Sequence, residues 1–158
     1  MQKPHVMSGL LPTLTTDPAD IAQVADLLTL CGLPIAGLED VTECFILRRD
    51  DKVVACAALE IRGKSGLLRS VAVHPDLRRE KLGQALVVMA LLMARTHRAT
   101  HLYLLTETAV GFFLKAGFTI IDRAGVDPAI QKTVEFTSAC PASATVMVMD
   151  LVKLAQKR

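Results

Sequence analysis

The sequence predicts an α+β domain in which helices cover both faces of a mixed, mostly antiparallel central sheet. Its 158 residues, 51% of them apolar, are enough for one domain, residues 1–158, with its own core. Residues 43–49, 52–61 and 67–74 are rich in apolar side chains and follow one another through short loops, which predicts an antiparallel meander. A long apolar helix then precedes the next strand, which predicts a parallel pair joined by a right-handed crossover.

Composition argues against several classes of function. The net charge of +2 is too small to indicate binding to nucleic acid or to an anionic membrane. The longest apolar run, Ala85 to Ala94, is far shorter than the roughly 20 residues of a membrane span. Met1 to Thr16 is broken by Pro4 and Pro12 and lacks the apolar stretch of a signal peptide. We therefore expect a soluble, cytoplasmic protein without membrane or nucleic-acid partners.

The cysteines do not predict a metal site. There are four of them, and none has the C-x-x-C spacing of a zinc or redox centre. Reduced cysteine often behaves as a small buried hydrophobe, so core packing is expected for Cys31, Cys44 and Cys56.

The first third of the chain predicts a weak strand and a well-defined helix. Val6 to Leu14 has the composition of a strand but is interrupted by Pro12. Asp17 suits the N-cap and Pro18 the first turn of a helix that runs to Leu30, because Gly32 and Pro34 end the apolar pattern. Residues 37–41 predict a turn or a short helical piece.

The meander places two opposite charges near the middle of the sheet. If Lys64 and Ser65 form the two-residue loop, Glu60 lies directly opposite Arg69. Two interpretations remain open, a cross-strand ion pair and a substrate-binding role, because charged residues on central strands seldom serve packing alone.

A cationic loop and a long helix follow the meander. The strand stops at Pro75, and Arg78, Arg79 and Lys81 precede a helix expected over residues 82–97. Open N–H groups and the helix dipole at such a start suit a phosphate group, although a solvated loop with an ordinary positive patch fits as well. The helix is apolar nearly all round, so the C-terminal segment or a second subunit should cover it, which makes a homodimer possible.

The C-terminal part predicts alternating strands and short helices. We expect a strand at 101–106, a helix at 109–116 closed by Gly117, a strand at 118–122 and a brief helical stretch after Pro128. The loop at 138–144 leads to a last strand at 145–152, and residues 153–158 resemble a frayed tail.

With this order of elements, the chain resembles the GNAT superfamily of acyl-CoA-dependent N-acetyltransferases. The family pattern [Q/R]-x-x-G-x-[G/A] corresponds to Arg78 to Gly83, with Lys81 in the place of the middle glycine. The second pattern, N-x-x-A-x-x-x-Y-x-x-x-G-F, corresponds to residues 106–118. Its alanine and its final Gly-Phe match, whereas Thr106 replaces the asparagine and Phe113 replaces the tyrosine.

The resemblance implies a fold and a cosubstrate. The sheet should have six to seven strands, and its parallel pair should splay apart to admit the pantetheine arm of acetyl-CoA. The resemblance, together with the helix start, implies that acetyl-CoA contacts Val71, Ala72, Val73, Arg78, Arg79, Lys81, Leu82, Gly83, Gln84, Ala85 and Phe113. If the backbone at Lys81 is helical, the missing glycine needs no positive φ. No metal is implied.

The expected reaction is acetyl transfer to a small anionic amine. Glu107, at the end of a strand, is the first candidate for the base and Glu60 the second, although Glu107 would also suit the first turn of the next helix. Since Phe113 cannot protonate the leaving thiolate, water, Tyr103 or a threonine hydroxyl such as that of Thr106 would have to replace the usual tyrosine.

The acceptor side is expected to carry an anion-binding group and a thiol. Arg69, with Ser70 beside it, would hold an anionic acceptor in a two-pronged contact. Cys140 would be a thiolate ligand for trivalent arsenic or a structural residue.

Residues 102–109 and 135–144 also resemble the arsenic-resistance-associated branch of GNAT proteins, which implies a bacterial detoxification context. Two other functions remain open, a catalytically weak acyl-CoA sensor and a thiol-based arsenic-binding protein on the same scaffold.

Overall fold

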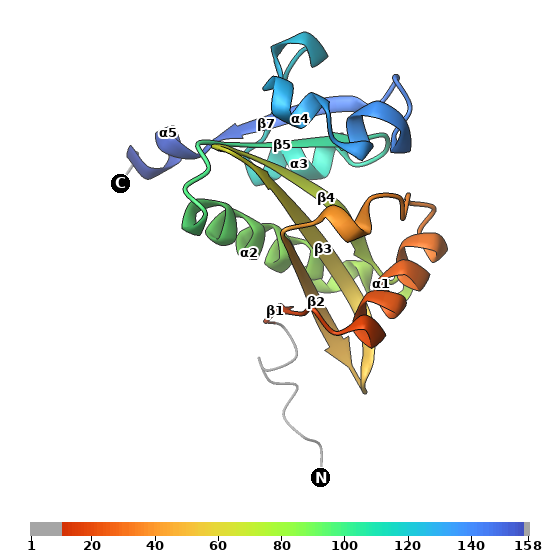
Figure 1. The fold of residues 1–158 in the computed structure, drawn as a ribbon. Coiled ribbons are helices and arrows are strands. Elements are labelled where there is room, and N and C mark those ends of the chain that lie inside the picture. Colours follow the sequence, from red (N-terminus) through yellow and green to blue (C-terminus); the bar gives the residue numbers. More distant parts are fainter. Residues whose placement is uncertain (1–10, 157–158) are drawn as a thin grey trace.

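A seven-stranded sheet is the framework of the molecule, with its strands in the order β1-β2-β3-β4-β5-β7-β6 (Figure 1). The computed structural model describes residues 11–156. All neighbouring strands are antiparallel except β4 and β5, which confirms the predicted mixed α+β fold. The strands are Thr13–Leu14 (β1), Glu43–Arg49 (β2), Lys52–Arg62 (β3), Ser65–Val73 (β4), His101–Thr106 (β5), Thr119–Ile120 (β6) and Thr145–Asp150 (β7).

Helices cover both faces of this sheet. Alternate residues of β2 and β3 belong to different cores: Phe45 packs with α2 and α3 on one face, and Ile46 packs with α1 on the other. A third core, under α4, continues the α1 face across β5 and β7 (Figure 1). The helices are Pro18–Leu30 (α1), Leu82–Thr96 (α2), Val110–Ala116 (α3), Pro128–Gln131 (α4) and Leu151–Gln156 (α5), with 3₁₀ turns at Leu38–Asp40 (η2), Pro75–Glu80 (η3) and Arg123–Gly125 (η4) and a π-helical turn at Glu135–Ala139 (η5).

Helix α1 forms as the sequence predicts. The side chain of Asp17 accepts a hydrogen bond from the Ala19 amide at 2.9 Å, and Pro18 occupies the first turn. Val24, Leu27 and Leu28 are buried against the sheet. The helix therefore places its C-terminal end, Cys31, beside the end of β4.

The hairpin between β3 and β4 has a different register from the predicted one. Gly63 and Lys64 form its loop, because Gly63 takes the φ of 62° that the turn requires. Glu60 consequently lies opposite Leu67, and Arg69 lies opposite Ala58, so the predicted pairing of Glu60 with Arg69 is wrong by two residues. Side chains alternate between faces with a period of two, so Glu60 and Arg69 still share one face and form a diagonal pair.

Strands β4 and β5 separate soon after they begin. Their pairing comprises Ser65 with His101, Gly66 with Leu102 and Leu67 with Tyr103. Beyond this point β4 continues to Val73 and carries a bulge at Ser70, whose φ is 59°. The expected splayed pair is therefore present.

Two features, at the surface of α2 and at the C-terminus, differ from the expectations. Val88 and Leu92 of α2 are more than half exposed, at 55% and 54%, so the described residues of the C-terminal segment do not cover this face of the helix. The last strand ends at Asp150 and not at residue 152, and residues 153–156 are part of a helix and not frayed, because the Asp150 carboxylate accepts the Lys153 amide at 2.9 Å. Of the weak strand predicted over 6–14, Thr13–Leu14 is present, and residues 6–10 lie outside the described residues.

A second subunit on α2 stays a prediction.

Among the described helices, none is long and apolar enough to span a bilayer.

Candidate active site

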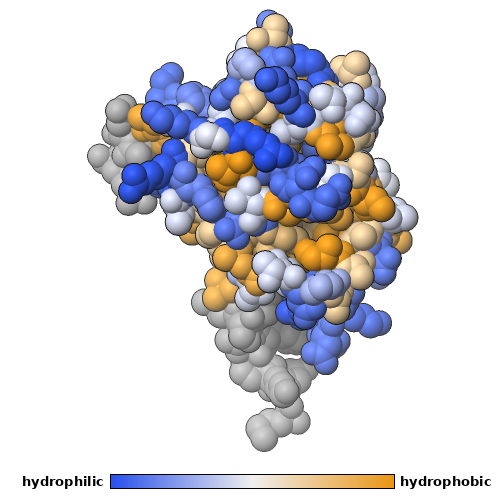
Figure 2. Space-filling model, in the orientation of Figure 1, coloured by the Kyte–Doolittle hydropathy of each residue, from blue (hydrophilic) through white to orange (hydrophobic). Residues whose placement is uncertain are grey.

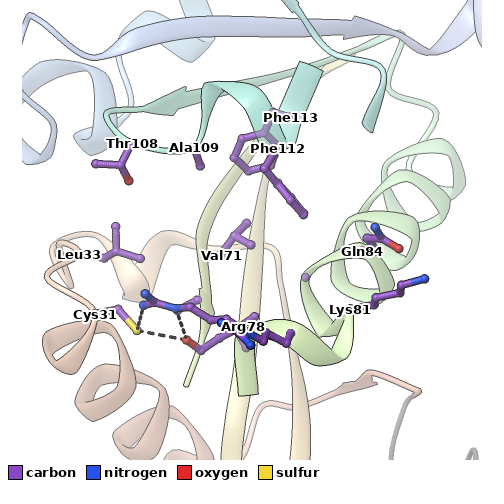
Figure 3. Close-up of a pocket in the computed structure, with 14 residues that line it drawn as sticks. Cys31, Leu33, Val71, Arg78, Lys81, Gln84, Thr108, Ala109, Phe112 and Phe113 are labelled. Carbon is purple, nitrogen blue, oxygen red and sulfur yellow. Dashed lines mark hydrogen bonds between the residues drawn. The ribbon is translucent and has the colours of Figure 1, made fainter. Parts of the chain in front are cut away.

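A cavity of about 510 Å³ lies where β4 and β5 part (Figure 3). Its walls come from the end of α1 and the loop that follows it, the last residues of β4, the η3–α2 junction, and the β5–α3 loop with α3. The lining residues are Cys31, Leu33, Val71, Ala72, Val73, Arg78, Arg79, Lys81, Gly83, Gln84, Thr108, Ala109, Phe112 and Phe113.

Most of the residues expected to bind the cosubstrate meet in this cavity. Leu82 and Ala85 do not line it: Leu82 is buried in the core, and the Ala85 amide bonds to the Lys81 carbonyl at 3.4 Å as part of the helix. Five residues that were not expected to bind the cosubstrate also line it, namely Cys31, Leu33, Thr108, Ala109 and Phe112. The sequence alone does not indicate them, because the end of α1 and the start of α3 come to border the same cavity only in the folded chain.

The first turn of α2 presents backbone donors at the cavity. The first N–H groups of an α-helix have no intrahelical acceptor, and the Lys81 side chain at the N-cap has no acceptor atom to offer them. Gly83 and Gln84, in this turn, line the cavity. This end of the helix therefore favours an anion, and Arg79 and Lys81 add positive charge there.

Lys81 adopts a left-handed backbone conformation, with φ 61° and ψ 24°. The condition under which the missing glycine would be unimportant, a helical backbone at Lys81, is therefore not met. A side chain in this conformation costs about 1–2 kcal/mol, because its Cβ crowds the following carbonyl.

Arg78 lies along the cavity towards α1 (Figure 3). Its Nε donates to the Val73 carbonyl at 3.3 Å, and its Nη2 donates to Cys31 Sγ at 3.6 Å. The Cys31 thiol in turn donates to the Val73 carbonyl at 3.6 Å. Cys31 is thus a cavity residue, whereas Cys44 and Cys56 lie in the core as expected.

The β5–α3 loop carries two of the predicted catalytic residues. The Thr106 hydroxyl accepts the Ala109 amide at 3.0 Å, so Thr106 fixes the start of α3. Glu107 follows it on the surface, and Thr108 lines the cavity. Phe113 is buried in edge-to-face contact with Phe112 and Phe118.

Tyr103 packs in the core under α4, away from the cavity lining.

Arg69 is at the centre of a buried ion cluster and not at an open surface. Its Nη1 donates to Glu60 Oε1 at 3.0 Å, and its Nη2 lies 3.2 Å from Glu135 Oε1. Nη2 also donates to the Ala36 carbonyl at 2.6 Å, and Nε donates to Ser70 Oγ at 3.1 Å. The side chain is fully enclosed, at 0% exposure, so its donors already have protein acceptors.

Glu135 was not predicted from the sequence as a site residue. Its other carboxylate oxygen accepts the Cys140 thiol at 2.7 Å. Burial, Glu135 and Glu107 together raise the pKa of the Cys140 thiol to about 12. The thiol therefore stays protonated near neutral pH, which does not suit a thiolate ligand. Among the residues that the structure describes, no group of three His, Cys, Asp or Glu is placed to hold a metal ion.

Comparisons with known proteins agree with this geometry. The model of the acetyltransferase (GNAT) domain family matches residues 40–120. Amino-acid acetyltransferases of Salmonella typhimurium and Escherichia coli are 37% and 35% identical over 79 residues. That match covers 49% of this chain but 18% of each relative, so the chain spans less than a fifth of the relatives' length.

Solved structures show the same fold. Rv2747 from Mycobacterium tuberculosis, in complex with CoA, is 22% identical and has a TM-score of 0.72, covering 88% of this chain and 99% of that one. N-acetylglutamate synthase from Neisseria gonorrhoeae, with coenzyme A and N-acetyl-glutamate, is 20% identical with a TM-score of 0.74, covering 89% of this chain and 35% of that one.

Proposed function

This chain belongs to the GNAT acetyltransferase family, and we propose that it transfers the acetyl group of acetyl-CoA to the amine of a small, amino-acid-like acceptor. One observation carries the proposal: the open end of α2 and the diverging end of β4 border the same cavity. This combination provides an anion site beside exposed strand backbone, which suits a diphosphate with an extended arm.

The cosubstrate would be held by the walls of this cavity. The amides of Gly83 and Gln84, with Arg79 and Lys81, would hold the diphosphate. The pantetheine arm would lie along Val71 to Val73, where β4 has parted from β5. The thioester would then lie towards Thr108, at the end of the cavity nearest to Glu107.

In the proposed reaction the neutral amine attacks the thioester carbonyl, a C–N bond forms and the C–S bond breaks. Glu107 is the proposed base, acting directly or through water, because it follows β5 on the surface beside the cavity. Glu60 suits this role less well, since it is 1% exposed and paired with Arg69 and Arg62. With Phe113 in the usual tyrosine position, water is the proposed proton source for the thiolate.

The acceptor class rests on the relatives and on residue resemblance. The amino-acid acetyltransferases support an amino-acid-like amine. A detoxification acceptor that contains arsenic or phosphorus, or an antibiotic, is supported by the resemblance of residues 102–109 and 135–144 alone. The raised pKa of Cys140 argues against arsenic binding through its thiolate.

A catalytically weak acyl-CoA sensor is the second candidate. It is favoured by Phe113, which lines the cavity but has no proton to donate.

Calorimetry with acetyl-CoA, followed by assays of CoA thiol release with a panel of amino acids and their phosphinate and arsenic analogues, tests both candidates. Binding with turnover supports the transferase, and binding without turnover supports the sensor. Absence of acetyl-CoA binding would refute both.

Glu107→Gln should lower kcat and alter the pH profile of kcat, whereas Asp51→Asn, at an exposed turn that does not line the cavity, should change neither. A pH profile identical to that of the wild type would exclude Glu107 as the base.

A further inference from the structure

Arg69 joins segments that are far apart in the sequence. It bonds to the Ala36 carbonyl in the loop after α1, to Glu60 on β3 and to Glu135 in the π-helical turn. The cluster is balanced in charge, because Arg62 and Arg69 match Glu60 and Glu135. A buried ion pair adds little stability compared with apolar packing, so its main consequence here is a defined geometry.

Gly37 shows how closely the loop lies against this cluster. A Cβ atom on Gly37 would be 2.8 Å from Arg69 Nη1 and 3.1 Å from Val134 Cβ, and its φ is 81°. An added Cβ would push the loop apart from Arg69 and Val134, and it would stand at a φ that favours glycine. The backbone of the loop is thus packed closely against Arg69 and Val134.

The same loop forms a wall of the cavity. Leu33, three residues before Ala36, lines the cavity, and Figure 3 shows it across from Thr108 at one end. Leu33 and Ile35 leave 37% and 48% of their surfaces exposed, so the loop presents apolar groups. Figure 2, in the orientation of Figure 1, shows hydrophobic side chains across the middle of the molecule, between more hydrophilic groups. With the thioester placed as in the proposed function, Leu33 and Thr108 would border the entry of the acceptor.

We propose that Arg69 is a positioning residue: it holds the loop 33–37 through the Ala36 carbonyl, Glu135 holds Arg69, and this wall selects the size of the acceptor. The inference rests on the proposed function for its reference to an acceptor. The positioning itself does not depend on catalysis, so the two are tested separately.

The obvious variant, Arg69→Met, removes the buried cation that Glu60 and Glu135 share and is expected to cost about 3–5 kcal/mol, enough to threaten folding. Milder variants serve better. Gly37→Ala forces the loop away from Arg69, whereas Gly63→Ala is a matched control, since Gly63 has a φ of 62° but no atom within 4 Å of an added Cβ. Both variants place a side chain at a positive φ, but only Gly37→Ala displaces the loop that forms the wall of the cavity.

A second pair of variants tests the carboxylate. Glu135→Ala removes the acceptor for Arg69 Nη2. Glu135→Gln keeps an oxygen there and should therefore behave much like the wild type. Glu43→Ala is the control, because it breaks a partly buried pair with His97, and neither residue lines the cavity.

Two measurements decide the inference. In the unliganded protein, hydrogen exchange of the Leu38 and Asp40 amides, which bond to Ile35 and Gly37, should accelerate about tenfold in Gly37→Ala and Glu135→Ala and stay unchanged in the controls. The ratio of kcat/KM for phenylalanine to that for glycine should shift about fivefold in the same two variants, with the KM for acetyl-CoA unchanged.

Unchanged exchange in both variants would overturn the positioning role, whatever the activity. Altered exchange with an unchanged acceptor ratio would overturn the selection of acceptor size. If the wild type turned over no amine, the proposed function would fail, and the exchange data would still decide whether Arg69 holds the loop.

Discussion

Gly83 lies directly against Phe112. A Cβ atom on Gly83 would be 3.2 Å from Cζ and 3.5 Å from Cε1 of the Phe112 ring. Since Gly83 is in the first turn of α2 and Phe112 is in α3, the contact sets the separation of two walls of the cavity.

Gly83→Ala should therefore weaken acetyl-CoA binding about tenfold, because the added methyl group pushes the Phe112 ring into the cavity. Gly111→Ala is the matched control: it lies in α3 with no atom within 4 Å of an added Cβ, and should gain about 0.5–1 kcal/mol of stability without loss of affinity. Calorimetry and thermal unfolding measure the two effects. Equal affinities of the two variants would contradict the role of this contact.

Lys81→Gly should raise the free energy of unfolding by about 0.5–1 kcal/mol, because glycine relieves the left-handed backbone. It should also weaken acetyl-CoA binding a few-fold and reduce its salt dependence, since a cation is lost. Arg98→Gly, at a φ of 63° and outside the cavity, should bring the same gain in stability with unchanged affinity. A fall in the unfolding temperature of Lys81→Gly would contradict the strain argument.

Cys140 should react slowly with iodoacetamide. Its thiol pKa is raised to about 12, so thiolate is scarce at pH 8 and the rate should climb with pH without a plateau below about pH 11. Glu135→Gln removes a negative charge that favours the protonated thiol, and with its amide oxygen at Arg69 it places an NH₂ group instead of an acceptor at Cys140, so it should lower the pKa and accelerate labelling. Mass spectrometry of the Cys140 peptide measures the rates. Labelling as fast in the folded as in the unfolded protein would contradict this prediction.

Phe113→Tyr should raise kcat by up to about tenfold if protonation of the thiolate limits turnover, because the new hydroxyl stands in the wall of the cavity. Phe112→Tyr is the control, since it adds the same group to the neighbouring position. A gain in both variants, or in neither, would show that the hydroxyl position is not limiting. Steady-state assays of CoA thiol release provide the comparison.

Local signals predicted most of the elements. Asp17 and Pro18 define the start of α1, and Gly117, with a φ of 106°, ends α3 as predicted. These residues act on their own backbone, so a short stretch of sequence is enough to predict them. Apolar patterning likewise predicted β2 to its observed ends, Glu43–Arg49.

The features that escaped prediction depend on contacts between distant segments. Glu135 reaches Cys140 through a π-helical turn, a rare conformation without a recognisable pattern. Gly63 set the hairpin register by taking the first loop position, whereas Lys64-Ser65 was the loop considered from the sequence. For Arg69, an ion pair with Glu60 and a role in acceptor binding were both left open; the ion pair is present, and the loop after α1 encloses the side chain, which only tertiary packing determines.

The short β4–β5 pairing also has a consequence for how the chain folds. The β2–β4 meander is held by contacts between neighbours in sequence, whereas β5 reaches β4 through three residue pairs and only after α2 has crossed the sheet. Closing that long connection costs chain entropy, and only a few contacts between β4 and β5 offset this cost. The meander should therefore dominate the transition state: Leu59→Ala in β3 should slow refolding, whereas Met147→Ala in β7 should mainly speed unfolding. Stopped-flow kinetics in denaturant would separate the two.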